Sequence, residues 1–169
     1  MNIQELKQEF IKYYGGDESD IRIFHSPGRV NLIGEHTDYN GGFVFPAALT
    51  MGTTIALRKN NENIIRLRAT DLPDFVEADI SKLDSYKDLH WGNYQLGSAL
   101  ELSKLGYRIC GCDMLYHDTL PHGGGLSSSA AIEVSTALAF ATLAKEADGD
   151  FSPVDMVQMA FCGQSAEHN

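Results

Sequence analysis

The stretch LPHGGGLSSSAA, Leu120 to Ala131, lies between a predicted strand and a long apolar helix. That helix, Ser127 to Ala144, carries a single charged residue, Glu133. A helix that is apolar on every side is expected to lie buried at the centre of its domain. The glycines ahead of it let the backbone approach a phosphate group, which free N–H groups and the helix dipole attract. The stretch therefore indicates a phosphate-binding loop; the alternative is a glycine turn with a serine N-cap.

This loop differs from two common phosphate-binding motifs. No Gly-Lys-Ser/Thr follows the glycines, so the loop is not a Walker A sequence. The chain also lacks the βαβ unit with a later ribose-binding acid that marks a dinucleotide fold. The hydroxyls of Ser127, Ser128 and Ser129 can nevertheless reach phosphate oxygens or Mg²⁺.

A second constellation, SPGRVNLIGEHTDYNGG, occupies residues 26–42, of which 38–42 are typical of a loop. Its polar side chains are Arg29, Asn31, Glu35, His36, Asp38, Tyr39 and Asn40. Two carboxylates, a guanidinium and an imidazole are suited to binding sugar hydroxyls, since carboxylates accept and cations donate hydrogen bonds. The alternative is a salt-bridged polar turn between strands.

Apolar alternation predicts the strands. They are expected at residues 21–25, 53–57, 64–67, 75–80 and 107–116. We expect 53–57 and 64–67 to be joined across the polar stretch 59–63, in an N-terminal half built of antiparallel hairpins.

Three helices are predicted besides the central one. Residues 3–14 are amphipathic and end at Gly15-Gly16. A second helix is expected to present one face made of Trp91, Tyr94, Leu102 and Leu105. A third begins at the N-cap signal Ser152-Pro153 and continues to the chain end. Because strands and helices are grouped rather than alternating, the fold class is expected to be α+β.

Composition limits the functional classes. The 169 residues carry 13 Lys plus Arg against 23 Asp plus Glu, a net charge of -10. An acidic chain without a basic cluster is not expected to bind nucleic acid or an anionic membrane. The N-terminus MNIQELKQEF has no apolar region typical of a secretory signal, and no apolar run approaches the ~18 residues of a membrane span. We therefore expect one cytoplasmic domain.

The three cysteines are too few and too irregular for a disulfide framework. Cys110 and Cys112, with His117 or His122, form a weak candidate for half of a zinc site. Alternating thiols in an apolar strand are more typical of a core.

The chain ends in GQSAEHN, residues 163–169. Glu167 falls on a mostly apolar helix, where a buried carboxylate would need a cation or a metal. The alternative is a last helical turn that faces solvent.

Together these motifs resemble those of a known family. SPGRVNLIGEHTDYNGG resembles the galactokinase signature, and GQSAEHN resembles the next galactokinase block. LPHGGGLSSSAA resembles the phosphate loop of the wider GHMP kinase superfamily, which includes homoserine and mevalonate kinases. The resemblance covers essentially the whole chain. It implies a GHMP-kinase N-terminal domain at residues 1–169, with a mixed, mostly antiparallel sheet and helices packed on one side.

The resemblance also implies roles for individual residues. Arg29 corresponds to the active-site arginine near the transferred phosphoryl group, and Glu35, His36 and Asp38 correspond to ligands of the sugar hydroxyls. Trp91 and Tyr94 correspond to the aromatic pair near the adenine, although core packing explains them equally well. Ser129, or else Ser128, would ligate Mg²⁺ together with Glu167. The implied ATP-phosphate loop consists of Gly123, Gly124, Gly125, Leu126, Ser127, Ser128 and Ser129.

The implied reaction is transfer of the γ-phosphoryl group of ATP to the anomeric hydroxyl of galactose, with Mg²⁺. The family places its catalytic aspartate and a second domain after the block that ends here at Asn169. We therefore expect an N-terminal fragment, about half of a galactokinase, that is inactive by itself. Three alternatives remain: a galactose- and ATP-binding regulator, an N-acetylgalactosamine kinase, and a domain of this fold used only for protein contacts.

Overall fold

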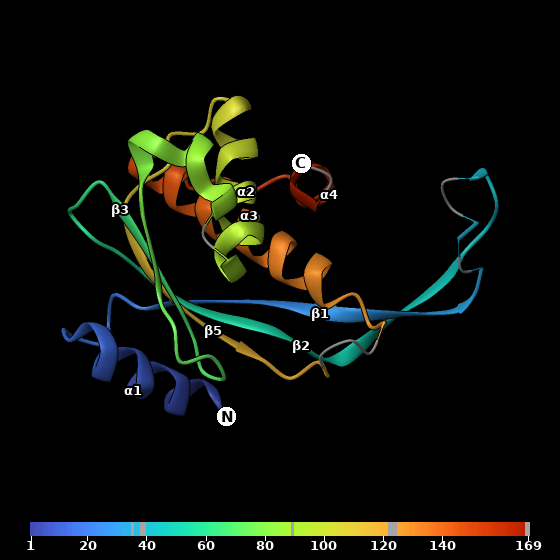
Figure 1. Ribbon diagram of the computed structural model, residues 1–169, viewed down its shortest axis with the longest axis horizontal. Coiled ribbons are helices and arrows are strands. Elements are labelled where there is room, and N and C mark those ends of the chain that lie inside the picture. The colour runs from blue at the N-terminus through green and yellow to red at the C-terminus, as the bar shows by residue number, and fades with distance from the viewer. Residues whose placement is uncertain (35, 38–39, 89, 122–124, 168–169) are drawn as a thin grey trace.

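The computed structural model describes residues 1–34, 36–37, 40–88, 90–121 and 125–167, and Figure 1 shows their arrangement. The helices are α1 (Ile3–Tyr14), α2 (Asn93–Lys104), α3 (Ser128–Ala147) and α4 (Met156–Glu167), with the 3₁₀ segments η2 (Ile80–Asp88) and η3 (His90–Gly92) before α2. The strands are β1 (Arg22–Ile33), β2 (Phe45–Lys59), β3 (Ile64–Ala69), β4 (Val76–Asp79) and β5 (Cys112–Asp118).

The strands form one mixed sheet in the order β1-β2-β5-β3-β4, so the α+β class is confirmed. Every neighbouring pair is antiparallel except β3 and β5, which are parallel. The expected hairpin between residues 53–57 and 64–67 is wrong, because β5 lies between those two strands. For example, Ile55 pairs with Tyr116, and Ile65 pairs with Cys112. A parallel neighbour requires a long crossover, and here the chain between β3 and β5 includes β4 and α2.

Helices cover both faces of the sheet. α2, α3 and α4 lie over one face, whereas α1 packs on the other (Figure 1). The alternation along β2 explains this, because Ile55 and Leu57 belong to the core beneath α2 and α3, and Ala56 packs with Leu6 and Phe10 of α1. The prediction that helices pack on one side is therefore correct for three α-helices and wrong for α1.

The predicted face of α2 is also corrected. Leu102 is buried as predicted, and Trp91 packs against the core from η3, ahead of the helix. Tyr94 and Leu105 are exposed, because the buried face is turned toward Gln95 and Leu96, with small residues beside them.

Several element boundaries differ from the prediction, among them the starts of β5 and α4. The expected strand at 107–116 begins only at Cys112, where pairing with Lys59 starts. The third helix starts at Met156 because Asp155 acts as the cap, its carboxylate accepting the N–H of Val157 at 2.9 Å. Ser152 instead accepts a hydrogen bond from the Lys145 Nζ at 2.6 Å.

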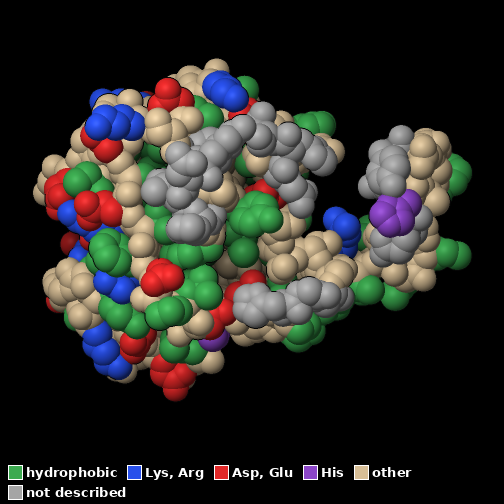
Figure 2. Space-filling view, viewed as in Figure 1, with side chains coloured by type: hydrophobic (Ala, Val, Ile, Leu, Met, Phe, Trp, Pro, Cys, Tyr) green, Lys and Arg blue, Asp and Glu red, His purple; other side chains and the backbone are tan. Residues whose placement is uncertain are grey.

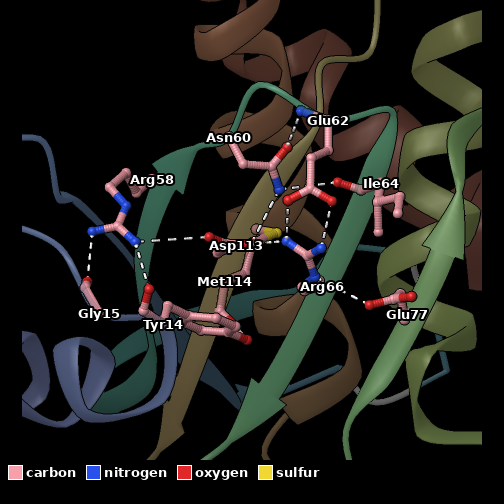
Figure 3. Close-up of polar contacts among 10 residues, drawn as sticks. All are labelled: Tyr14, Gly15, Arg58, Asn60, Glu62, Ile64, Arg66, Glu77, Asp113 and Met114. Atoms are coloured by element: carbon pink, nitrogen blue, oxygen red, sulfur yellow. Dashed lines mark hydrogen bonds and ion pairs between the residues drawn. The ribbon is translucent and has the colours of Figure 1, made fainter.

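A cluster of polar side chains links neighbouring strands at the end of the sheet that lies next to the β2–β3 loop (Figure 3). The Asp113 carboxylate on β5 is almost fully buried, and it accepts hydrogen bonds from Asn60 Nδ2 at 3.0 Å and from Arg66 Nη1 at 3.3 Å. Arg66 also contacts Glu62 at 2.6 Å and Glu77 at 3.1 Å. The cluster therefore links β5 with β3, β4 and the β2–β3 loop.

Arg58 extends this cluster to α1. Its Nη2 lies 3.8 Å from the Asp113 carboxylate, and its guanidinium donates to the carbonyls of Tyr14 at 3.2 Å and Gly15 at 2.8 Å (Figure 3). These carbonyls close the C-terminal end of α1, where a cation is favoured by the helix dipole. The same guanidinium lies 5.1 Å from the ring centre of Phe10. Arg58 thus fixes α1 to its face of the sheet.

Asp113→Ala is expected to lower the free energy of unfolding by about 2 kcal/mol, because the substitution leaves Asn60 and two guanidinium groups facing an apolar gap. Arg66 keeps two other carboxylates, so the loss should be smaller than for an isolated buried pair. Chemical denaturation measures it. The matched control is Glu77→Ala, whose half-exposed ion pair with Arg66 should contribute less than ~1 kcal/mol. Equal losses in the two variants would contradict the cluster's structural role.

Within the described ranges, no helix is long and apolar enough to cross a membrane.

Candidate active site

The two motifs singled out in the sequence touch each other. The backbone N–H of Arg29 donates to the carbonyl of Leu126 at 3.1 Å, which joins β1 to the loop before α3. Gly28 allows this approach, because a Cβ at that position would lie 2.5 Å from Leu120 Cδ2 and 2.9 Å from the Leu126 carbonyl oxygen. The regular pairing of β1 with β2 is interrupted between Pro27 and Arg29, where Gly28 lies. The sugar-signature strand and the glycine-rich loop therefore form one continuous surface.

β1 is longer than predicted. It runs from Arg22 to Ile33 and so includes the first half of the 26–42 constellation. Arg29 is consequently a strand residue with an exposed side chain, rather than part of a polar turn. The interpretation of a salt-bridged turn is wrong for residues 26–33.

Gly28→Ala is expected to destabilise the fold by about 1–3 kcal/mol, because the added methyl group overlaps a backbone carbonyl that cannot easily move away. Thermal or chemical unfolding measures this change. Adding Leu120→Ala is not expected to restore the loss, because it leaves the overlap with the Leu126 carbonyl and truncates a buried side chain. An unchanged melting temperature in Gly28→Ala would show that the close approach does not constrain the loop.

The loop leads into α3 through two left-handed backbone conformations. Gly125 has φ 65° and Ser127 has φ 59°, and α3 begins at Ser128. Ser127 occupies the N-cap position of α3, as the alternative interpretation expected, but within the described part of the chain its side chain makes no capping hydrogen bond. The first-turn N–H groups of a helix have no intrahelical acceptor, and they attract anions. Gly123 and Gly124 lie outside the described residues.

The approach of α4 to α3 positions the two residues predicted to bind metal. Gln158 and Ala144 line one surface hollow, and Gly163 packs on Glu133, where an added Cβ would come within 3.1 Å. The second half of α4 therefore packs on the first half of α3. Glu167 lies one turn beyond Gly163, and Ser129 lies one turn before Glu133. The backbone thus brings the Glu167 position toward the first turn of α3; the Glu167 side chain lies outside the described part.

The far halves of β1 and β2 form a hairpin arm, residues 30–51, that projects from the domain (Figure 1). Its turn is held by Thr37, whose hydroxyl donates to the carbonyls of Gly34 at 2.7 Å and Phe43 at 3.0 Å. Figure 2 shows the arm standing apart from the body, with apolar side chains on its outer surface. His36 lies exposed in the turn with φ 60°, whereas Glu35 and Asp38 fall outside the described residues.

A small cavity brings the predicted aromatic pair together beside α3. Its volume is about 170 Å³, and its lining includes Thr53, Trp91, Tyr94, Gln95, Tyr116 and Ile132. Trp91 packs edge-on against Tyr116 at 6.4 Å between ring centres. The Tyr116 hydroxyl lies 2.9 Å from Thr136 Oγ1, which fixes that ring from α3. Ile132 is one turn after the start of α3, so the cavity adjoins the glycine-rich loop.

The structure adds residues that sequence reasoning missed. The sequence could have indicated the role of Gly28, because a glycine inside a strand often marks a close approach of another backbone segment. No sequence pattern could have indicated that Thr53, Gln95 and Tyr116 line the cavity, since they come from three separate elements.

The weak zinc candidate gains no support. Cys112 is fully buried in the core, and burial raises the pKa of its thiol, which disfavours the thiolate that zinc requires. Among the described residues there is no group of three or more potential metal ligands of the His, Cys, Asp and Glu types.

Comparison with known proteins shows what the chain is similar to. The Galactokinase galactose-binding signature matches residues 8–59, and the GHMP kinases N terminal domain matches residues 93–169. A galactokinase of Clostridium tetani is 43% identical over 169 residues, which are 100% of this chain and 41% of that protein. A galactokinase of Bacillus subtilis is 38% identical over 98% of this chain and 42% of its own length.

Comparison with solved structures gives the same result as comparison of sequences. The Lactococcus lactis galactokinase in complex with galactose matches with a TM-score of 0.84 and 34% identity, over 98% of this chain and 42% of that chain. A mevalonate kinase matches in fold alone, with a TM-score of 0.72 at 22% identity over 86% of this chain and 46% of its own. The chain therefore has the N-terminal domain of the GHMP kinases. Within that class it is similar over its whole length to galactokinases, and it spans about two-fifths of the length of these galactokinases.

Proposed function

We propose that this chain is the N-terminal part of a galactokinase, which transfers the γ-phosphoryl group of ATP to the anomeric hydroxyl of D-galactose and yields galactose 1-phosphate. The observation that carries the proposal is the contact of Gly28 and Arg29 with Leu126. Since the sugar signature and the phosphate loop adjoin, a sugar hydroxyl and the end of a triphosphate can meet there. Phosphoryl transfer depends mainly on such positioning and on charge stabilisation.

Two regions of the site would bind ATP, one holding its phosphates and the other its adenine. The loop 123–129 and the first turn of α3 would receive the phosphates with backbone N–H groups and serine hydroxyls. The adenine would enter the cavity beside Trp91 and Tyr94, whose aromatic rings offer a stacking surface. The first turn of α3 connects the two places, so a single nucleotide can reach both.

The residues near the start of α3 suit Mg²⁺. A serine hydroxyl from Ser129 and a carboxylate from Glu167 are the hard oxygen ligands that Mg²⁺ prefers, with phosphate oxygens completing the set. The packing of Gly163 on Glu133 supports this pairing, because it directs the end of α4 toward Ser129. Charge on the β- and γ-phosphates would be neutralised by Mg²⁺ when it is bound.

Galactose would bind between Arg29, at the base of the hairpin arm, and the turn of that arm. Glu35, His36 and Asp38 are proposed to bond its hydroxyls, and Arg29 to stabilise the charge that develops on the transferred phosphoryl group. The supporting observation is that Arg29 and His36 belong to one strand and its turn. We place the reaction in the cytoplasm, where ATP is available, and assign no role in nucleic-acid or membrane binding.

A coupled assay of the full-length product of the source gene tests the proposal. Galactose-dependent ADP release that requires Mg²⁺ is the expected result, with N-acetylgalactosamine a poor substrate. Nucleotide and galactose binding without turnover would favour a regulator instead. Preferential turnover of N-acetylgalactosamine would move the protein to the related kinase activity, and failure to bind any nucleotide would leave a domain for protein contacts.

A further inference from the structure

We propose that Glu133 determines the preference of the nucleotide site for metal-bound over metal-free ATP, because its buried negative charge repels a triphosphate that carries no cation. This inference rests on the proposed function and goes beyond it, since no step of the proposed reaction uses Glu133. The residue lies on α3, and only 1% of it is exposed. It is the one charged residue in the stretch from Ser127 to Ala144.

Two other helices pack against α3 at Glu133. On α4, a Cβ added to Gly163 would come within 3.1 Å of the Glu133 Cβ. On α2, the Ser98 hydroxyl lies 3.5 Å from the Glu133 carbonyl oxygen, and it also donates to the carbonyl of Tyr94 at 3.0 Å. Glu133 is therefore buried where α2, α3 and α4 meet. Salt screens a charge in such a place much less than a charge on the surface.

Glu133 lies close to the turn of α3 that is proposed to receive the phosphates. It follows Ser129 by one helical turn, which corresponds to about 6 Å along the helix axis. Helical side chains lean toward the N-terminal end of their helix, which in α3 is the end that carries the glycine-rich loop. A full negative charge also exceeds the roughly half positive charge that the helix dipole places at this end. The start of α3 is therefore less favourable to a free anion than a helix N-terminus without such a residue.

The glycine-rich loop contains no lysine or arginine to offset this charge. None occurs between Leu120 and Ala144, whereas a Walker A loop places a lysine beside its phosphates. A divalent cation between Ser129, Glu167 and the phosphates would supply positive charge there, and its attraction to Glu133 would add to the effect of its ligands. Glu133 therefore disfavours ATP alone and favours the complex of ATP with Mg²⁺.

Glu133→Gln tests the assignment, because glutamine keeps the size of the side chain and removes its charge. Calorimetric titration of the full-length product of the source gene measures the affinity for ATP in excess Mg²⁺ and in EDTA, independently of turnover. Wild type is expected to bind ATP at least about tenfold more tightly in Mg²⁺, and Glu133→Gln should lose most of that ratio through tighter binding of metal-free ATP. A purely structural role would weaken both affinities together and leave their ratio unchanged.

Two variants serve as controls. Glu133→Asp keeps the charge and should keep the ratio. Glu146→Gln, near the end of the same helix, removes a carboxylate that pairs with Arg22 and should leave the ratio unchanged. An unchanged ratio in a folded Glu133→Gln protein would overturn the inference. Equal affinities of the wild type in Mg²⁺ and in EDTA would also overturn it, and that measurement needs no variant.

The inference and the proposed function can fail separately. If Glu133→Gln loses the ratio but the wild type phosphorylates no sugar, the inference is supported and the proposed galactokinase activity is overturned. If the wild type phosphorylates galactose and Glu133→Gln keeps the ratio, only the inference is overturned.

Discussion

Arg29→Ala is expected to lower the kcat for galactose phosphorylation about 10³-fold in the full-length product of the source gene. Arginines that contact a transferred phosphoryl group contribute rate factors of this order, because their charge meets the negative charge of the transition state. The backbone of Arg29 is fixed by its N–H bond to Leu126 and by the close packing of Gly28, while its side chain remains exposed. The guanidinium can therefore be aimed from a rigid strand at the end of a bound triphosphate.

Steady-state kinetics separate this role from simple ATP binding. Because the interaction strengthens in the transition state, kcat should fall much more than the KM for ATP rises. Arg29→Lys should recover only part of the rate, since lysine keeps the charge but loses the planar fork. Arg22→Ala is the matched control, because Arg22 lies on the same strand but pairs with Glu146 at 2.5 Å, away from the loop. A kcat unchanged in Arg29→Ala would remove this arginine from the reaction centre.

The fold was predictable wherever the signal was local. The helix at residues 3–14 was predicted with its correct bounds, since an apolar face and a glycine stop agree there. The position of β5 between β2 and β3 was not predictable from local patterns. Strand pairing depends on contacts between distant segments, and the alternation along β2 fits a hairpin with β3 as well as it fits pairing with β5.

The site was predictable to the extent that motifs mark it. The sequence pointed to Trp91 and Tyr94 through a family resemblance, and the structure brings both to one cavity beside α3. The roles of Arg29, Asp38, Ser129 and the other motif residues stay predictions until they are measured. The place of Gln95 and Tyr116 in the lining of that cavity could not be predicted, because packing alone brings these residues together.

A polypeptide limited to these 169 residues is expected to show no galactose-dependent ADP release, even with saturating ATP, galactose and Mg²⁺. It contains Arg29, the glycine-rich loop and the aromatic cavity. The family resemblance places the catalytic aspartate after Asn169, and loss of a positioned acid or base typically costs ~10²–10⁴-fold. The proposed reaction centre is also open to water, which weakens every electrostatic interaction in it.

The surface of the chain supports this expectation and predicts its behaviour in solution. On α4, Val157 and Phe161 are mostly exposed, and on the hairpin arm Phe43 is 99% exposed and Ile33 is also exposed. Large exposed apolar side chains on these two parts of the surface favour an interface or self-association. We therefore expect the isolated polypeptide to elute as dimers or larger species in size-exclusion chromatography.

A matched pair of variants tests the origin of that association. Phe161→Ser should shift the elution toward monomer. Phe10→Ser should instead unfold the chain, because Phe10 is buried between α1 and the sheet. ATP binding by the monomeric Phe161→Ser variant is expected to persist weakly, because the loop and the cavity are local features. Robust galactose-dependent ADP release from such a monodisperse monomer would contradict the prediction, since it would place the catalytic base within residues 1–169.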